Sequence, residues 1–311
     1  AVNGRAVLET VADDLIDKVF AASVKLSVAG IEHFISQLIL VSAKEVLGDA
    51  EKDDAGGRLF ALQRLVEVAD FNMNERPRIV WTRMWKLMST HFTNVGCHQN
   101  ETVSMFAIDS LRQLSFKFLE KPELKDFNFQ RLFLEPFLVI MKSSSSREDT
   151  RELILCCIDN IIRTLCKNIR SGWKTIFSVL ALSASDQSVK ISKLGLVIVQ
   201  RLLDDHMDLF FSVEEDFVCL IQTSFNFVFN ADVEGVNPPA GLSMKAICHA
   251  GFYADIIAMN CKTNKFKFER GNGKKIVFQS YNKNAPHFTY KGFEKELEDY
   301  DEKADGEKKQ L

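Results

Sequence analysis

Residues 169–180, IRSGWKTIFSVL, decide the fold of this chain because their pattern occurs twice. Arg170 precedes Trp173 by three residues and Phe177 by seven. Side chains at these intervals lie on one face of an α-helix. Gly172, directly before the tryptophan, would let the chain turn tightly or let a neighbouring helix approach closely. The stretch therefore predicts the start of a packed helix.

The same spacing occurs earlier, in RIVWTRMWKLM, residues 78–88, where Arg78 is followed by Trp81 and then Trp85. Arg170 follows Arg78 by 92 residues, which is about two units of the ~40–47 residues typical of HEAT or armadillo repeats. Two Arg–Trp pairs could also align by chance. We interpret them as equivalent positions in two helix pairs, because a second repeated pattern exists.

That second pattern is AIDSLRQL (107–114) and CIDNIIRTL (157–165), with Asp109 and Asp159 at matching places. Apolar residues recur at intervals of three and four over most of the chain before residue 262, which is typical of helix. A single helix pair cannot bury its apolar face alone, so such pairs stack. The predicted fold is all-α: a superhelical solenoid of HEAT- or armadillo-like stacked helix pairs, followed by a poorly structured C-terminal tail.

Helix boundaries follow from the periodicity and from capping residues. Asn100, Ser146 and Ser212 each precede a periodic run and are predicted N-caps, and Pro136 suits the first turn of a helix. The predicted helices are 6–28, 31–47, 58–74, 77–92, 101–120, 136–143, 148–167, 171–183, 186–204, 213–229 and 241–259.

Composition divides the chain into three predicted parts. Residues 1–205 form a helical-repeat domain, and residues 206–261 form a further helix pair or the start of the next region. Residues 262–311 are a basic and then acidic linker or tail, with seven Lys or Arg between 262 and 288. Within this tail, a short hairpin across Gly271–Gly273 would fit the alternating residues on both sides.

The bulk composition excludes several classes of protein. The chain has 311 residues, is 46% hydrophobic and carries a net charge of −3, which gives no general case for nucleic-acid binding. Its seven cysteines show no CxxC spacing and indicate reduced thiols in a cytosolic protein. No apolar run reaches the ~18 residues of a membrane-spanning helix. The chain opens with Ala and no signal peptide, which we interpret as a segment of something larger.

Catalytic and cofactor motifs are not found, and neither is a metal site. GNGKK (271–275) lacks the spacer and the Ser or Thr of a phosphate loop. His91, Cys97 and His98 lie within eight residues, but loop packing explains them better than zinc does. We expect core packing rather than nucleophilic reactivity for the cysteines on apolar helix faces, namely Cys156, Cys157, Cys166, Cys219 and Cys248.

Two sets of residues are candidates for binding. The first is a partner-binding set near the repeated helix starts, Arg78, Arg170, Trp173 and Lys174. The arginines could instead fasten neighbouring helices, and Trp173 could be a core residue. The second is a set for contact with anionic lipid or an acidic partner: Lys265, Lys267, Arg270, Lys274 and Lys275. A solvated linker is the alternative for this stretch.

These residues also carry a resemblance to a known family. The stretches in question are LQRLVEVADFNM (62–73), RIVWTRMW (78–85), HFTNVGCHQN (91–100), FAIDSLRQLSFKFLEK (106–121), FNFQRLFLEPF (127–137) and NIRSGWKTIF (168–177). Together they resemble the region downstream of the catalytic domain in the large Golgi Arf guanine-nucleotide exchange factors, the Sec-seven or brefeldin A-inhibited exchange-protein family. The resemblance covers residues 5–205 and weakens from residue 206. Pro122 departs from it, since the family continues with an acidic residue there.

The resemblance implies a role. The parent protein would release GDP from an Arf GTPase through a separate domain with a glutamate finger, which this sequence does not contain. This segment would be a non-catalytic regulator that binds activated Arf, the catalytic domain of the same exchange factor or the anionic Golgi membrane, but no nucleic acid. It would act in Golgi vesicle traffic, in the cytoplasm and peripherally at the trans-Golgi network. The alternative is a generic helical-repeat scaffold or adaptor with no link to a GTPase.

Overall fold

The computed structural model describes residues 13–48, 59–123, 127–143, 147–210 and 213–229, together with three strands between residues 265 and 291. The chain divides into two compact units, Ala1–Val179 and Leu180–Leu311. The boundaries predicted at 205/206 and 261/262 stay predictions. No described helix is both long and apolar enough to cross a lipid bilayer.

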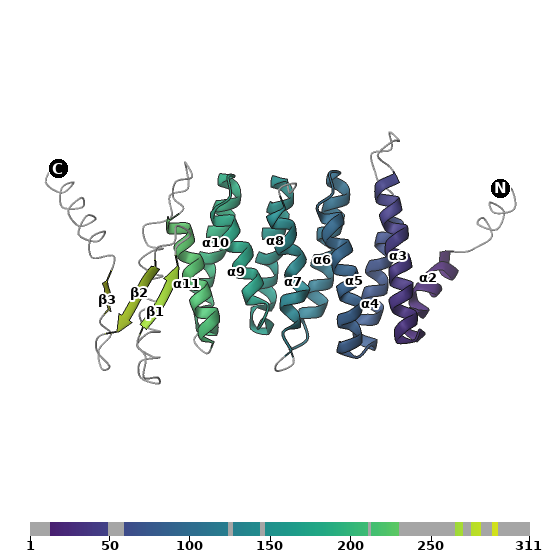
Figure 1. Cartoon of the computed structure of the whole chain (residues 1–311), viewed down its shortest axis with the longest axis horizontal. Helices are drawn as coiled ribbons and strands as arrows, with labels where there is room; N and C mark the ends of the chain where they lie inside the picture. Colours follow the sequence, from purple (N-terminus) through teal and green to yellow (C-terminus); the bar gives the residue numbers. More distant parts are fainter. Residues whose placement is uncertain are drawn as a thin grey trace. The chain divides into compact units, whose positions relative to one another are not determined.

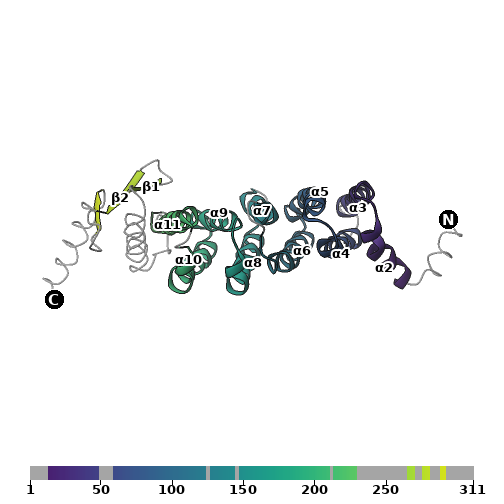
Figure 2. The same ribbon diagram turned by 90° about the horizontal axis from the view of Figure 1, so that it is seen from below.

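The first unit consists of helices that run alternately up and down (Figure 1). They are α2 (Asp13–Ala21), the 3-10 turn η1 (Ala22–Lys25), α3 (Val28–Gly48), α4 (Phe60–Glu75), α5 (Arg78–Gly96), α6 (Glu101–Leu119), α7 (Phe129–Lys142), α8 (Glu148–Leu165), η3 (Cys166–Asn168) and the first half of α9 (Trp173–Ala184). Figure 2 shows two rows, with α3, α5 and α7 in one and α2, α4, α6 and α8 in the other. The predicted all-α fold of stacked helix pairs is confirmed.

Aromatic residues of the repeated pattern fill the core of this unit. The Trp85 ring stacks on the Phe133 ring at a centroid distance of 3.9 Å, and Trp173 stacks on Phe177 at 5.5 Å. Trp81 is also buried. Burial of these large aromatic side chains between successive pairs therefore holds the stack together.

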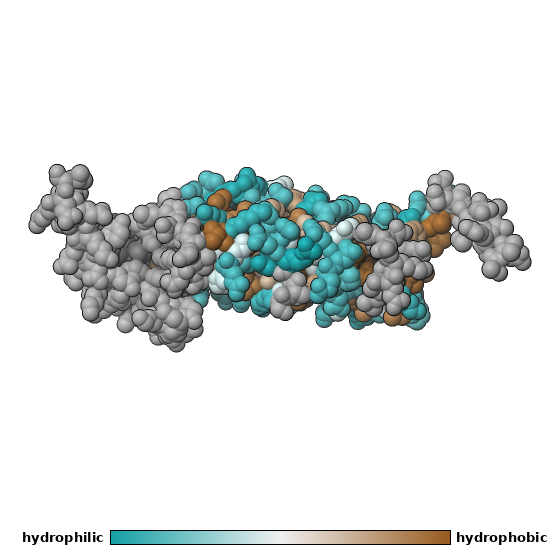
Figure 3. Space-filling view, turned by 90° about the horizontal axis from the view of Figure 1, so that it is seen from above, coloured by the Kyte–Doolittle hydropathy of each residue, from teal (hydrophilic) through white to brown (hydrophobic). Residues whose placement is uncertain are grey.

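The outer surface differs from this core. The edge of the unit where α3, α5 and α7 end is mainly hydrophilic (Figure 3).

Most predicted helices are present, with boundaries shifted by a few residues. The helix predicted over 6–28 is interrupted: α2 ends at Ala21, a 3-10 turn follows, and α3 begins at Val28. Ser27 explains this start, because its Oγ accepts a hydrogen bond from Gly30 N at 3.1 Å. Asn100 is confirmed as an N-cap, with its side chain accepting from Val103 N at 3.3 Å. Ser146, Ser212 and the helix predicted over 241–259 lie outside the described residues.

The prediction that Pro136 begins a helix is wrong. Pro136 lies in the interior of α7, which starts seven residues earlier at Phe129. A proline has no N–H to donate to the carbonyl four residues before it, here that of Leu132. That carbonyl oxygen instead accepts a hydrogen bond from the indole Nε1 of Trp85 at 3.2 Å. A donor from α5 thus supplies the bond that the proline removes from α7.

The second unit begins with the end of α9 and continues with α10 (Val189–Asp205), η4 (Met207–Phe210) and α11 (Glu214–Phe229). Gly195 of α10 permits close packing, because a Cβ there would come within 2.9 Å of Ser183 Cβ and 3.0 Å of Phe227 Cζ. The three strands are β1 (Lys265–Glu269), β2 (Lys275–Ser280) and β3 (Phe288–Lys291), antiparallel in that order. The predicted hairpin is confirmed as β1–β2, and β3 was not predicted.

Candidate partner-binding edge

The NIRSGWK segment is fastened to the linker between α6 and α7. The Glu123 carboxylate accepts hydrogen bonds from Gln130 N at 2.9 Å, Ser171 N at 3.0 Å and Ser171 Oγ at 2.6 Å. Gln130 N belongs to the first turn of α7, whose N–H groups have no partner within the helix. One carboxylate therefore serves both the start of α7 and the turn that leads into α9.

Gln130 completes this connection from inside the protein. Its side chain is fully buried; Nε2 donates to Asn168 O at 2.9 Å, and Oε1 accepts from Arg170 N at 2.7 Å. Asn168 Nδ2 in turn donates to Leu119 O at 3.0 Å. Buried polar groups that are all paired rigidify their surroundings. We call these four residues, Glu123, Gln130, Asn168 and Ser171, the clamp.

Gly172 lies where the clamp brings the turn against α7. A Cβ at this position would be 3.1 Å from Leu134 Cδ1 and 3.4 Å from Gln130 Cβ. The first separation is tighter than an ordinary contact, so the glycine allows a close approach. The chain also turns at Ser171 and Gly172, where Trp173 N donates to Arg170 O at 3.1 Å, so the two roles that the sequence left open for Gly172 are compatible.

The clamp presents three cations at the surface. Arg131, Arg170 and Lys174 are exposed, and the first turns of α7 and α9 are adjacent, because Arg131 N donates to Ser171 Oγ and Thr175 Oγ1 donates to Arg131 O, both at 3.3 Å. Within the described part of the chain, these three side chains form no hydrogen bond or ion pair. We call Arg131, Arg170 and Lys174 the basic edge.

Arg131 is missing from the set predicted from the sequence. It precedes Arg170 by 39 residues and lies in FNFQRLFLEPF, where no pattern marks it as a binding residue. Only the hydrogen bonds between the starts of α7 and α9 place it beside Ser171. The sequence therefore identifies two members of the basic edge, Arg170 from the repeated pattern and Lys174 beside it, and tertiary contacts supply the third.

The other two predicted partner-binding residues contribute to the stack. Arg78 is half-buried, and its Nη2 donates to Pro122 O at 3.0 Å, so it fastens α5 to the α6–α7 linker. Trp173 is only 3% exposed and is a core residue. Both correspond to the structural alternatives stated for them.

The candidate lysines for lipid or an acidic partner lie partly in the sheet. Lys265 and Lys267 belong to β1, and Lys275 belongs to β2, paired in register with Gln279, Val277 and Glu269, respectively. Arg270 and Lys274 lie outside the described residues. A binding role for these five residues stays a prediction.

His91 and His98 each have a hydrogen-bond partner in the described part of the chain. His91 is buried and its Nε2 lies 2.9 Å from Ser42 Oγ, and burial lowers the pKa of its imidazole. His98 Nδ1 accepts from Asn100 N at 3.0 Å at the end of α5. Among the described residues, no three His, Cys, Asp or Glu side chains form a group that could hold a metal ion.

The cysteine prediction holds in part. Cys157 and Cys166 are buried, Cys219 is half-buried, and burial raises the pKa of the Cys157 thiol to about 12. Cys248 lies outside the described residues. For Cys156 the prediction is wrong, because this residue is exposed. The buried apolar stripe of α8 consists of Ile154, Leu155, Cys157, Ile158, Ile161 and Ile162. At about 100° per residue, Cys156 points away from this stripe.

The paired helices, the two rows and the clamp between successive pairs define a helical-repeat protein. Residues 117–201, which include the clamp, match a family model described as Mon2/Sec7/BIG1-like, HDS. This region of the chain is similar to part of the Sec7-like Arf guanine-nucleotide exchange factors, as the relatives below also indicate.

Three relatives illustrate the similarity. Brefeldin A-inhibited guanine nucleotide-exchange protein 1 of Homo sapiens is 41% identical over 219 residues, which cover 69% of this chain and 12% of the relative. The Arabidopsis thaliana protein of the same name is 36% identical over 231 residues, 73% of this chain and 13% of that one. The ADP-ribosylation factor guanine nucleotide-exchange factor sec71 of Schizosaccharomyces pombe is 39% identical over 192 residues, 62% of this chain and 10% of that one.

Proposed function

We propose that this chain acts as a non-catalytic regulatory segment of an Arf guanine-nucleotide exchange factor and binds a GTP-loaded Arf-type GTPase through the basic edge. The observation that carries this proposal is that Arg131, Arg170 and Lys174 are exposed and unpaired within the described part of the chain, beside a clamp that orders the backbone. The similarity of the chain to Arf guanine-nucleotide exchange factors supports an Arf-type partner.

The chemistry of the basic edge suits an acidic protein surface. A guanidinium group can form two parallel hydrogen bonds with one carboxylate, which adds specificity to charge attraction. Because the clamp orders the backbone around Arg170 and Ser171, binding there costs less conformational entropy than binding by a loose loop. Exposed charges of this kind increase the rate of association and make it depend on salt.

Regulation requires that Arf–GTP distinguishes two states of the exchange factor. If the basic edge contacts the catalytic domain in a restrained state, Arf–GTP releases the restraint only by binding the released state more tightly. Such coupling typically amounts to about 1–3 kcal/mol. Attraction of the β1 and β2 lysines to an anionic Golgi membrane would add about 1 kcal/mol per basic residue near the surface. In this scheme the segment acts peripherally at the cytoplasmic face of the trans-Golgi network.

Flotation with anionic liposomes tests the proposal. The chain is mixed with liposomes that carry Arf loaded with GTP or with GDP, and recruitment is compared for wild type, Arg170→Glu and Lys174→Glu. Lys193→Glu is the matched control, since Lys193 is an exposed helix lysine outside the basic edge. We expect recruitment with Arf–GTP only, which both edge variants reduce and the control leaves unchanged.

Other outcomes would overturn the proposal. If recruitment is equal with both nucleotides and high salt abolishes it, the chain binds the anionic lipid through its basic strands and not Arf. Equal recruitment that resists salt, or no recruitment of any sample together with no binding to the isolated catalytic domain, would favour the scaffold or adaptor alternative. An Arg170→Glu variant with a strongly lowered melting temperature would show that Arg170 is a structural residue.

A further inference from the structure

An open groove of about 320 Å³ lies between α5 and α7. It is lined by Ser89, Thr90 and Thr93 from α5 and by Leu132, Pro136 and Val139 from α7. Leu132 and Val139 are 39% and 43% exposed and lie about two turns apart on α7. The α7 wall of the groove therefore presents apolar side chains to solvent, together with the exposed carboxylate of Glu135.

The two helices are held close at both ends of the groove. At one end, the Trp85 ring stacks on Phe133 at 3.9 Å, and its Nε1 donates to Leu132 O. At the other end, Gly96 leaves room for the side chain of Ile140. Between these contacts the α5 wall consists of short side chains, which cannot fill the space up to α7. The groove is thus a consequence of the packing of these two helices.

The hydroxyl groups on the α5 wall already have partners. Ser89 and Thr90 donate to Lys86 O at 3.4 and 3.2 Å, and Thr93 donates to Ser89 O at 2.8 Å. A ligand that covers these residues therefore does not need to satisfy their O–H groups. Apart from the exposed Asn94, whose side chain has no hydrogen bond among the described residues, such a wall accepts an apolar partner at a low desolvation cost.

Exposed cations flank the groove. Lys86 lies one turn before Thr90 on α5, and Lys142 lies one turn after Val139 on α7. Neither lysine pairs with an acid among the described residues. Glu135 is an exposed acid on the same wall. The two lysines outnumber this one acid, so the flanks of the groove are basic.

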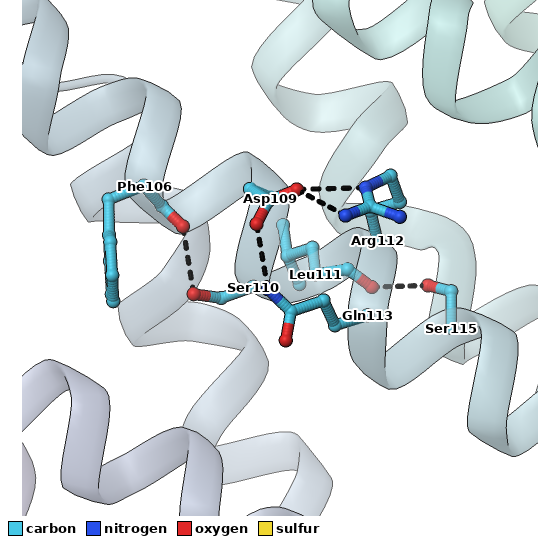
Figure 4. A network of polar contacts seen from close by, with 7 residues as sticks. All are labelled: Phe106, Asp109, Ser110, Leu111, Arg112, Gln113 and Ser115. Atoms are coloured by element: carbon cyan, nitrogen blue, oxygen red, sulfur yellow. Dashed lines mark hydrogen bonds and ion pairs between the residues drawn. The ribbon is translucent and has the colours of Figure 1, made fainter.

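Charged side chains of α4 and α6, in the opposite row of helices, differ from Lys86 and Lys142 because they already pair with other residues of the protein. Asp109 forms an ion pair with Arg112 at 2.7 Å and accepts from Gln113 (Figure 4). Lys117 of α6 pairs with Asp70 of α4 at 2.6 Å. An external acid would have to compete with these contacts, whereas Lys86 and Lys142 are available.

We propose that the α5–α7 groove binds the apolar face of an amphipathic α-helix whose flanks are acidic, provided by a partner protein. Apolar anchors three, four and seven residues apart on one helix face match a groove of this kind. The acidic flanks would pair with Lys86 and Lys142, and Glu135 would disfavour an acid in the centre and so select the register. This surface differs from the basic edge and does not depend on the proposed function.

Three synthetic peptides of about 20 residues, long enough to become helical on binding, test the proposal. They share Leu at three-, four- and seven-residue intervals and Gln at the central polar positions, and they carry Glu, Gln or Lys at the flanking polar positions. Binding of each labelled peptide to the 311-residue chain is measured by fluorescence anisotropy at low and high salt. We expect the Glu peptide to bind tightest and the Lys peptide weakest, with a difference that shrinks at high salt.

Matched variants locate the binding. Val139→Asp and Lys86→Glu should each weaken binding of the Glu peptide by about tenfold, the equivalent of one lost anchor or charge pair. Val197→Asp and Lys193→Glu are the controls, since Val197 is similarly exposed at 48% and both controls lie on α10. Circular dichroism and melting curves check that all four variants are folded.

Four results would overturn the proposal. The first is a Lys peptide that binds as well as the Glu peptide, and the second is unchanged binding by Val139→Asp. The third is self-association of the chain that Val139→Asp abolishes, seen by analytical ultracentrifugation, which would make the groove a contact between two copies. The fourth is binding to anionic vesicles that only Val139→Asp removes, which would assign the surface to lipid.

Discussion

The indole Nε1 of Trp85 donates a hydrogen bond to the carbonyl oxygen of Leu132 at 3.2 Å. Pro136 lies four residues after Leu132 and has no N–H for this carbonyl. The tryptophan of one helix therefore replaces a backbone donor missing from another. The Phe133 ring next to Leu132 stacks on the same indole. Both the ring packing and the hydrogen bond between α5 and α7 at this point thus depend on the side chain of Trp85.

Trp85→Phe should lower the free energy of unfolding by about 1–3 kcal/mol, because it leaves the Leu132 carbonyl without a donor. The loss of ring contacts should lower it further. Chemical denaturation measures this change. Pro136→Ala restores an N–H to α7, so Trp85→Phe should cost less in that background. Additive effects in this double-mutant cycle would contradict the assigned role of the indole.

Glu123→Ala should destabilise the chain by about 1–3 kcal/mol, because Gln130 N, Ser171 N and Ser171 Oγ lose their charged acceptor. Thermal melting measures the loss. Glu120→Ala is the matched control, since Glu120 is exposed and its side chain has no hydrogen bond among the described residues. Equal effects of the two substitutions would mean that the clamp contributes nothing to stability.

Gly195→Ala should destabilise the chain by about 1–3 kcal/mol, since its Cβ would overlap Ser183 and approach Phe227 Cζ to 3.0 Å. Gly30→Ala is the control in the first turn of α3, where the nearest atom is the exposed Ser27 Oγ at 3.1 Å. There we expect no loss or a slight gain, because alanine favours helix. Urea titration of both variants is the measurement, and a neutral Gly195→Ala would refute the tight packing.

His91 should make stability depend on pH. Burial lowers its folded-state pKa below the ordinary histidine value of about 6.5, so the unfolded state binds more protons as pH falls below that value. Its contribution is therefore fully present above about pH 6.5 and is lost progressively as pH falls toward the folded-state pKa. Denaturation curves between neutral and mildly acidic pH measure this loss.

The matched comparison for this prediction uses two glutamine variants. His91→Gln should flatten the decline of stability with pH, and His33→Gln should not, because His33 is exposed. An equal slope in wild type and His91→Gln would assign the acid sensitivity to other groups.

The sequence by itself determined the class of fold. Apolar residues three and four apart predict helices because this periodicity is local. The spacing of Arg78 and Arg170 by 92 residues predicts repeated pairs because each pair must stack to bury its face. The Asn100 cap and the β1–β2 hairpin could be predicted for the same reason, since their partners lie within a few residues in the chain.

The tertiary structure alone decided what depends on distant partners. α7 continues through Pro136 because Trp85, 47 residues from Leu132, supplies a donor. Arg131 joins Arg170 and Lys174 only because α7 and α9 meet at Ser171. The α5–α7 groove likewise arises where short and long side chains of two helices fail to fill one space. Such features follow from contacts across the stack, which the local pattern of residues does not specify.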